Sequence, residues 1–324
     1  MSKIPEHLIE KINEIPLLPG IYKMIDRERR IIYIGKSISL KKRVKSYFIG
    51  THKRKKVERM VSLINDIEYI VTDTHLEARL LECKLIKTVK PIFNVQFKND
   101  KKYAYLKIND YNIHNSISIT NKKGENSFGP FRNVYLVSSI INSFNNLYPI
   151  VEKDDNYDFE YNLFPINMNK ENFEINKESL ISIFSDNNNL LLFIDKLEQK
   201  MKIAASSLEF ATAAIFRDII YGLKYLNFSI YGKDEIFHKN LVLKIPIPYG
   251  YKLFFVSRGK VIFKKSYSSL NQADIESFAD IGQNLISSNN ISENQKAVID
   301  FRDILYSEIN SLPKEMVLFQ DREI

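Results

Sequence analysis

The chain is poor in cysteine and has no long apolar segment. It contains a single cysteine, Cys83. One cysteine excludes an internal disulfide and any zinc or iron–sulfur site built from several cysteines. No apolar run is long enough to span a bilayer, and Met1 to Glu14 carries mixed charges where a secretory signal would have an apolar core. These absences predict a cytoplasmic protein with no membrane partner.

The positive charge is concentrated in the N-terminal third. The 324 residues carry a net charge of +8. Residues 1–110 hold 24 Lys and Arg against 13 Asp and Glu, whereas the remaining 214 residues hold 23 against 26. A basic segment beside an acidic remainder favours a polyanion such as DNA, bound largely through its phosphates. A solvated lysine-rich surface would explain the total charge less well than this asymmetry.

Two short apolar runs near the N-terminus have the composition of β-strands. They cover residues 21–25 and 31–34, and the charged residues 26–30 between them indicate a hairpin turn. A helix is predicted at residues 40–48, where apolar residues recur at helical spacing. Arg43 and Tyr47 stand four residues apart on one face of that helix. Two tyrosines, a lysine and an arginine thus converge where a strand leads into a helix.

The residues that carry this pattern resemble the signature of the GIY-YIG nucleases. The signature consists of Gly20-Ile21-Tyr22 and Tyr33-Ile34-Gly35, with Lys36, Arg43 and Tyr47 behind it. The longer pattern from Leu18 to Phe48 is similar to the N-terminal nuclease half of the UvrC family, which makes incisions in bacterial nucleotide excision repair. Either tripeptide alone is weak evidence, but both at this separation are strong. The alternative is a small α+β core whose tyrosines only pack.

The resemblance implies a set of catalytic residues. They are Tyr22, Tyr33, Lys36, Arg43, Tyr47, Glu82 and Asn94. Glu82 would bind one Mg²⁺ or Mn²⁺ ion. Tyr33 or Tyr22, made more acidic by Lys36, would orient or deprotonate a water molecule. Lys36 and Arg43 would neutralise charge on the phosphate, and Tyr47 and Asn94 would shape the site.

The residues around Glu82 leave two interpretations of its role. The capping box from Thr74 to Glu77 predicts a helix that ends before Pro91. On that helix Glu82 faces the apolar stripe or its edge. A carboxylate placed there needs a partner, which is either a metal ion or Arg79 on the helix surface. The motif upstream favours the metal.

Basic residues around the motif are predicted to contact the DNA backbone. They are Lys41, Lys42, Lys45, Lys53, Arg54, Lys55, Lys101 and Lys102. The segment 98–107 mixes lysine with tyrosine, a combination suited to a nucleic acid strand. A plain strand with solvated lysines is equally consistent with that segment.

Residues 190–226 predict a helical hairpin. Apolar residues step by threes and fours through its first helix. Its second half resembles the UVR motif, through which the B and C subunits of the excision nuclease pair, although Ala211 replaces the acidic residue usual there. The predicted residues for binding a UvrB-like partner are Met201, Leu208, Phe210 and Arg217. An ordinary or self-pairing hairpin is the alternative.

These patterns predict an α+β protein built from several parts. The predicted parts are a GIY-YIG nuclease domain at 1–100, a UvrC-like extension at 101–150, a linker with at most one short helix at 151–189, the UVR hairpin at 190–226, and a small α+β domain of unknown role at 227–324. The last part shows no convincing carboxylate cluster for a second active site.

Three hypotheses for the function follow. The first is a metal-dependent DNA endonuclease that makes a single-strand incision in nucleotide excision repair. The second keeps the same chemistry but places it in recombination, mobile-element or branched-DNA processing. The third is a non-cleaving DNA-binding adaptor, which is disfavoured because every catalytic residue of the resemblance is present.

Overall fold

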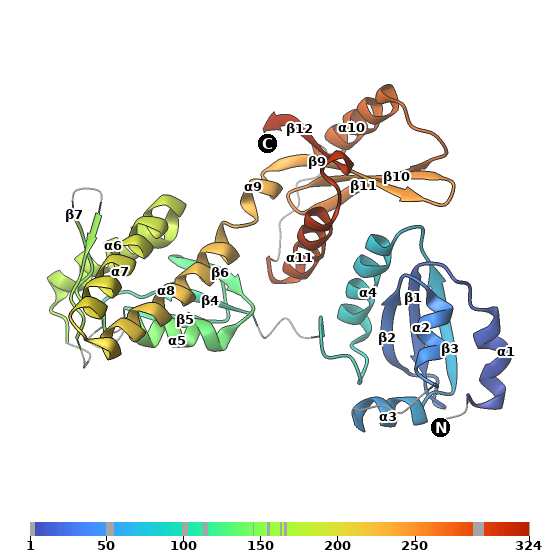
Figure 1. Ribbon diagram of the computed structural model, residues 1–324, viewed down its shortest axis with the longest axis horizontal. Helices are drawn as coiled ribbons and strands as arrows, with labels where there is room; N and C mark the ends of the chain where they lie inside the picture. Colours follow the sequence, from blue (N-terminus) through green and yellow to red (C-terminus); the bar gives the residue numbers. More distant parts are fainter. Residues whose placement is uncertain are drawn as a thin grey trace. The chain divides into compact units, whose positions relative to one another are not determined.

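The structure is a computed structural model that describes residues 4–49, 55–98, 103–112, 116–144, 146–153, 156–162, 164, 167–287 and 295–323. The chain divides into two compact units (Figure 1). One unit combines residues 1–100 with residues 236–324, and the other is formed by residues 101–235. Helix and strand are both abundant, so the protein is of the predicted α+β class. No helix in the described part of the chain is both long and apolar enough to cross a membrane.

The N-terminal half of the first unit is built on a three-stranded antiparallel sheet. Its strands are β1 (Gly20–Ile25), β2 (Ile31–Ser37) and β3 (Asp66–Val71), in the order β2-β1-β3. The helices are α1 (Glu6–Glu14), α2 (Leu40–Ser46), α3 (Lys55–Ser62) and α4 (His75–Val89). Apolar residues of α1, α2 and α3 form one core with β1 and β2. Strand β2 is therefore an edge strand, with one side of its backbone open to other partners.

The C-terminal half of the first unit contains a four-stranded sheet. It is formed by β9 (Lys239–Ile247), β10 (Gly250–Ser257), β11 (Lys260–Tyr267) and β12 (Val317–Glu323), in the order β11-β10-β9-β12. The accompanying helices are α9 (Asp234–Phe237), α10 (Gln272–Ser287), α11 (Gln295–Ser311) and the short 3₁₀ helix η2 (Lys314–Met316).

Helix α4 belongs to both halves of the first unit. Its Leu76 and Cys83 are fully buried in a core formed with residues of β9, β10 and α11, and α11 lies beside α4 in Figure 1. The single cysteine is thus a small core residue. Ion pairs join the same surfaces, including Arg79 with Glu308 at 2.8 Å. The C-terminal half is therefore packed against the helix that follows the motif.

The second unit combines small sheets with a helical bundle. Strands β4 (Ala104–Ile108), β5 (Ile117–Thr120) and β6 (Ser127–Phe131) form a sheet in the order β5-β4-β6, and β7 (Val151–Lys153) pairs with β8 (Asn156–Asp158). The helices are α5 (Val134–Phe144), α6 (Lys170–Ser185), α7 (Asn187–Ser206) and α8 (Phe210–Ile230). Helices α7 and α8 form the predicted hairpin, and their apolar faces join one common core.

The prediction of a linker at residues 151–189 is wrong. This range contains β7, β8 and the 16-residue helix α6. Phe173, Ile183 and Phe184 of that helix are fully buried. The predicted boundaries at 150, 189 and 226 also fall inside one compact unit, because α8 extends to Ile230 and packs on α5. The segment was mistaken for a linker because its sequence is acidic and rich in asparagine.

Candidate active site

Three tyrosines converge on one face of the N-terminal sheet. Strands β1 and β2 pair so that Tyr22 lies opposite Gly35 and Tyr33 lies opposite Met24. Both tyrosines therefore point to the same face. Helix α2 is followed directly by Tyr47, whose hydroxyl oxygen lies 2.8 Å from that of Tyr22. The three ring centroids are 6.0 to 6.2 Å apart, so the predicted tyrosines form one cluster.

Arg43 adds a positive charge to the tyrosine cluster. Its Nη2 donates a hydrogen bond of 3.1 Å to the hydroxyl of Tyr47. The guanidinium carbon lies 4.8 Å from the centre of the same ring. The four-residue spacing on one helix makes both contacts possible. Arg43 remains exposed, so its charge is accessible to an anion in solution.

The two glycines of the motif are required by close approaches. A Cβ atom at Gly35 would lie 2.4 Å from the hydroxyl oxygen of Tyr22, and one at Gly20 would lie 2.2 Å from the carbonyl oxygen of Ile70. Any larger residue would displace the tyrosine or the neighbouring strand. Gly35 thus leaves room for Tyr22 in the cluster, and Gly20 leaves room for the neighbouring strand β3.

Burial decides the acidity of the phenols. Burial and the neighbouring phenols raise the pKa of Tyr22 well above its usual value. Burial, followed by the Tyr47 phenol, also raises the pKa of Tyr33. Arg43 acts in the opposite direction on both but is outweighed. In the protein alone both phenols therefore have a raised pKa, whereas the prediction was that one of them is more acidic than usual.

Glu82 is bound to Lys36, not to Arg79. Its Oε1 accepts a hydrogen bond of 3.1 Å from the backbone N–H of Lys36, and its Oε2 accepts one of 2.9 Å from Lys36 Nζ. The Glu82 side chain is buried on α4, whose N-terminus is fixed by the predicted capping box. Because Arg79 pairs with Glu308, the structure gives no support to a surface ion pair between Arg79 and Glu82.

The segment after α4 forms hydrogen bonds with the backbone at the open edge of β2. The carbonyl of Ile32 accepts a hydrogen bond of 3.0 Å from the N–H of Phe93. Asn94 accepts from the Ile34 N–H at 2.9 Å and donates to the Ile34 carbonyl at 2.8 Å. Together with Glu82 on Lys36, the partners engage every second residue along the edge. Asn94 is thus a positioning residue for the strand that carries Tyr33, a detail that the sequence pattern alone did not reveal.

Glu82 is the carboxylate that this site offers to a metal ion. Among the described residues no group of three or more His, Cys, Asp or Glu side chains could hold one. Mg²⁺ commonly binds proteins through one or two carboxylates and completes its octahedron with water and substrate phosphates. Glu82 offers two hard oxygen atoms beside Lys36, and the exposed Arg43 adds a second cation at the tyrosine cluster. The donor set therefore fits an ion that binds together with a phosphate-bearing substrate.

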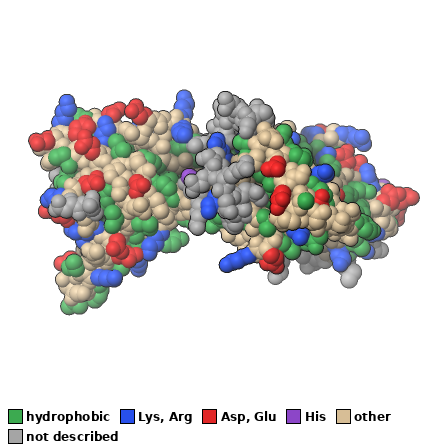
Figure 2. All heavy atoms as spheres, turned by 90° about the horizontal axis from the view of Figure 1, so that it is seen from above, with side chains coloured by type: hydrophobic (Ala, Val, Ile, Leu, Met, Phe, Trp, Pro, Cys, Tyr) green, Lys and Arg blue, Asp and Glu red, His purple; other side chains and the backbone are tan. Residues whose placement is uncertain are grey.

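Several of the predicted DNA-binding residues lie on the surface of the N-terminal half of the first unit. Lys42 and Lys45 are exposed on α2, and Lys55 is exposed on α3. Lys41 donates to the backbone carbonyl of Asn13. Lys53, Arg54, Lys101 and Lys102 lie outside the described residues. Figure 2 shows basic side chains scattered among acidic ones on the face that it draws, without one large basic field.

The predicted partner-binding residues divide into two groups. Leu208 and Phe210 lie at the turn between α7 and α8 and are 73% and 66% exposed. Leu208 also has a φ of 62°, an uncommon conformation for a leucine. Arg217 is exposed and pairs with the adjacent Asp218, whereas Met201 packs against the core of the second unit. The tip of the hairpin is therefore apolar and accessible.

Comparison with known proteins points to one family. A family model described as the UvrC-like GIY-YIG domain matches residues 18–95. The UvrABC system protein C of a Thermoanaerobacter species is 34% identical over 292 residues, which cover 82% of this chain and 47% of that protein. The protein of the same name from Alkaliphilus oremlandii is 31% identical over an alignment of 350 residues, which covers 98% of this chain and 52% of that protein. The chain thus spans about half the length of the curated relatives that it matches.

A solved structure is also similar to part of the chain. It is the GIY-YIG N-terminal endonuclease domain of UvrC from Thermotoga maritima, bound to its catalytic divalent cation, magnesium. The identity is 35%, the match covers 28% of this chain and all of that domain, and the TM-score is 0.26.

Proposed function

Because residues 18–95 are a UvrC-like GIY-YIG domain, we propose that the protein is a metal-dependent DNA endonuclease that makes a single-strand incision in nucleotide excision repair. The observation that carries the proposal is the position of Glu82. Its buried carboxylate is held at the β2 edge by Lys36, on the strand that also carries Tyr33. A nuclease site needs a charged oxygen ligand, cations and a proton acceptor in one place, and this edge brings them together.

Glu82 would hold one Mg²⁺ or Mn²⁺ ion, which polarises the phosphate and makes a nearby water or phenol more acidic when bound. Lys36 and Arg43 would neutralise the charge that develops on the phosphate oxygens. Asn94 would keep β2, and with it Lys36, in register with Glu82. One carboxylate gives weak affinity for the ion, so we expect tight binding only when DNA is present.

Tyr33 is better placed than Tyr22 to accept a proton from the attacking water. Tyr22 is 1% exposed, and its hydroxyl is paired with that of Tyr47. Tyr33 is only partly buried, and its phenol is close enough to Glu82 to feel the negative charge of the carboxylate. Its raised pKa means that the phenol alone is a poor base near neutral pH. Tyr33 would therefore act only after a cation has lowered that pKa.

Nicking of a supercoiled plasmid tests this function directly. The plasmid would be undamaged or irradiated with ultraviolet light, and Mg²⁺ or Mn²⁺ would be supplied, with and without the partner subunits. Glu82→Gln should abolish nicking because the neutral amide is a poor metal ligand, although it can still accept a hydrogen bond from Lys36. Glu10→Ala removes an exposed carboxylate on α1 and should leave nicking unchanged.

Each result of the plasmid assay has a defined meaning. Metal-dependent nicks that disappear in Glu82→Gln would support the endonuclease and its metal ligand. Wild-type activity in Glu82→Gln would refute the assignment of the site. A preference for irradiated plasmid that needs the partner subunits would support a role in excision repair. A branched DNA substrate tested in parallel separates the other hypotheses: nicking of that substrate without nicking of either plasmid would favour the second hypothesis, and binding without nicking would favour the adaptor.

We also propose that the α7–α8 hairpin binds a UvrB-like subunit. The exposed Leu208 and Phe210 at its tip offer apolar surface for a second helical hairpin. The test is a pull-down with an excision-repair B subunit. Leu208→Ser together with Phe210→Ser should abolish capture, whereas Tyr135→Ser, an exposed aromatic residue on α5, should not. Capture that is unchanged in the double variant would refute the hairpin as the contact.

A further inference from the structure

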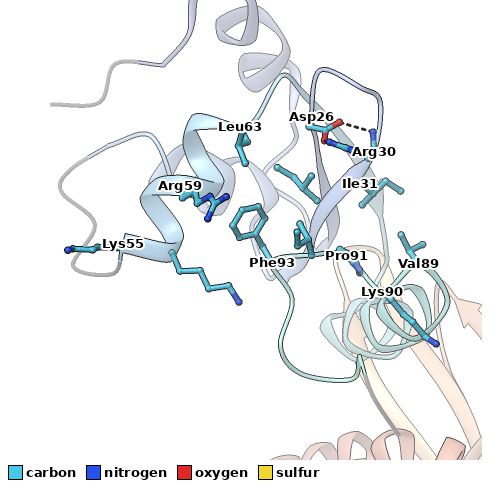
Figure 3. Close-up of a pocket in the computed structure, with 13 residues that line it drawn as sticks. Asp26, Arg30, Ile31, Lys55, Arg59, Leu63, Val89, Lys90, Pro91 and Phe93 are labelled. Carbon is cyan, nitrogen blue, oxygen red and sulfur yellow. Dashed lines mark hydrogen bonds and ion pairs between the residues drawn. The ribbon is translucent and has the colours of Figure 1, made fainter. Parts of the chain in front are cut away.

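A cavity lies at the N-terminal end of strand β2. It has a volume of about 820 Å³ and is lined by the β1–β2 turn, α3, the end of α4 and the segment after it. In Figure 3, Phe93 and Pro91 lie between two groups of side chains. Arg59 of α3 and Leu63, just after α3, are on one side, and Val89 and Lys90 at the end of α4 are on the other. None of the seven predicted catalytic residues lines it. The cavity is therefore separate from the tyrosine cluster.

The cavity combines an apolar floor with a basic rim. Pro91, Ile32 and the ring of Phe93 supply buried or half-buried apolar surface, and Ile92 adds apolar surface that is 68% exposed. The cations at the rim are Lys55, Lys56, Arg59, Lys90 and Arg30. A volume of this size suits a ligand of nucleotide dimensions, since small-molecule sites are about 300 to 1,000 Å³.

The charge at the rim is unbalanced toward positive. Asp26 is the single acidic residue in the lining, and Arg30 neutralises it through an ion pair of 2.8 Å. Lys55, Lys56, Arg59 and Lys90 form no ion pair with any described carboxylate. Four positive charges around an apolar floor are complementary to a ligand that has a flat apolar part and several negative charges.

The backbone conformation of Lys90 supports the same kind of ligand. Lys90 ends α4 with a φ of 53° and a ψ of 53°, in the left-handed region. Glycine is the usual residue there because a side chain is strained in that conformation. A lysine at this position therefore lowers the stability of the fold slightly compared with glycine. In return, the lysine places a positive charge at the mouth of the cavity.

The cavity and the Glu82 carboxylate lie along the same strand. Ile32 lines the cavity and Lys36 binds Glu82, so the two sites are four residues apart on β2. At about 3.3 Å per strand residue, that separation is roughly 13 Å. A nucleic acid strand advances about 3.4 Å per nucleotide in B-form, so one strand can reach both sites within a few nucleotides.

We propose that this cavity binds an unpaired nucleotide of the DNA strand that enters the active site. Its base would stack on Phe93 above the apolar floor, and the flanking phosphates would contact Arg59 and Lys90. Stacking on an aromatic ring and contact with cations at the backbone are the two interactions that single strands offer to proteins. The proposal rests on the proposed endonuclease function and specifies how that enzyme holds its substrate.

Binding of a short fluorescent oligothymidylate to the full chain in EDTA tests the proposal without catalysis. The second probe is an abasic oligomer with the same number of phosphates. Phe93→Leu keeps an apolar side chain but removes the stacking surface. It should weaken binding of oligothymidylate about fivefold or more, the low end of the stacking contribution of one base. Binding of the abasic oligomer should stay unchanged.

The cations at the rim should affect both probes. Arg59→Ala and Lys90→Gly should each weaken both complexes and lower the slope of log affinity against log salt by about 0.7, the value for one lost phosphate contact on a single strand. Lys90→Gly suits its left-handed backbone, so weaker binding cannot be attributed to unfolding. Lys84→Ala removes an exposed lysine of α4 outside the cavity and serves as the matched control.

The outcomes separate this proposal from the proposed function. Equal binding of both probes by the wild-type protein, or wild-type binding by Phe93→Leu, would overturn the base-binding cavity even if the plasmid is nicked. Selective loss of oligothymidylate binding in Phe93→Leu would support the cavity, and it would do so even if the wild-type protein failed to nick any plasmid. Failure of the wild-type protein to nick any plasmid would count against the proposed endonuclease function and not against the cavity.

Discussion

The clamp that Asn94 forms on β2 can be tested with a nearly isosteric substitution. In Asn94→Asp one carboxylate oxygen can still accept from the N–H of Ile34. The other oxygen would face the Ile34 carbonyl, to which the wild-type Nδ2 donates at 2.8 Å. The side chain of Asn94 is buried. Leaving a buried polar group unpaired costs about 1 to 3 kcal/mol, and more for a charged group, so we expect a loss of at least about 2 kcal/mol near neutral pH.

The pH dependence of this loss identifies its cause. The ionised carboxylate that Asn94→Asp introduces would be repelled in the folded protein, so its folded pKa would be raised above the unfolded value of about 3.9. Once protonated, the carboxyl can donate to the Ile34 carbonyl again. The stability of Asn94→Asp relative to wild type should therefore be highest below about pH 4 and fall as the pH rises through the folded pKa.

The assay is urea unfolding of both proteins at about pH 4.5 and about pH 7.5, with plasmid nicking as a second readout near neutral pH. Asn13→Asp provides a matched control, because that side chain is exposed on α1. A loss below about 0.5 kcal/mol near neutral pH, or a loss independent of pH, would refute the clamp. A stable variant with wild-type nicking would refute its role in positioning β2.

Three further predictions concern the surroundings of the site. Gly35→Ala should cost about 1 to 3 kcal/mol in an unfolding assay and lower nicking, because its Cβ would lie 2.4 Å from the hydroxyl of Tyr22. Burial raises the pKa of Glu77, but hydrogen bonds from two lysines of the C-terminal sheet outweigh burial and lower the net pKa. The stability that Glu77 contributes should therefore be present above its unfolded pKa of about 4.3 and be lost at lower pH. A Glu77→Gln protein should lose less stability over that pH range. Arg79→Ala and Glu308→Ala should each lower the free energy of unfolding by about 3 kcal/mol. In a double-mutant cycle, the loss in the double variant should be smaller than the sum of the two single losses.

The active site was predictable to the extent that its contacts are local in sequence. The tyrosine hairpin, the Arg43–Tyr47 spacing and the capping box of α4 all depend on residues within a few positions of each other, and the structure contains each of them. The pairing of Asn94 with Ile34 joins residues 60 positions apart. No local pattern marks such a contact, and only the resemblance to the family indicated that Asn94 belongs to the site.

The missed helix α6 shows how a buried face can look polar in sequence. Asn176 and Ser179 are both buried. Asn176 accepts from the backbone N–H of Ile150, and Ser179 accepts from that of Glu152. These side chains satisfy backbone groups next to β7 and are therefore not signs of solvent exposure. The prediction of a linker was based on polarity alone, and these two polar residues supported it. Phe173 and Leu180 on the same helix stand seven residues apart, which is the spacing of a helical repeat.

The packing of the C-terminal half on α4 gives that half a physical connection to the site. Lys252 is 8% exposed and pairs with Glu77 at 2.8 Å, and the two residues are far apart in sequence. Glu77 belongs to the first turn of α4, and Glu82 follows on the same helix five residues later. A rigid helix transmits a displacement of its first turn to Glu82, whose carboxylate must remain within hydrogen-bond distance of Lys36. Residues 236–324 therefore help to fix the predicted metal ligand, although none of the seven predicted catalytic residues lies in that part of the chain.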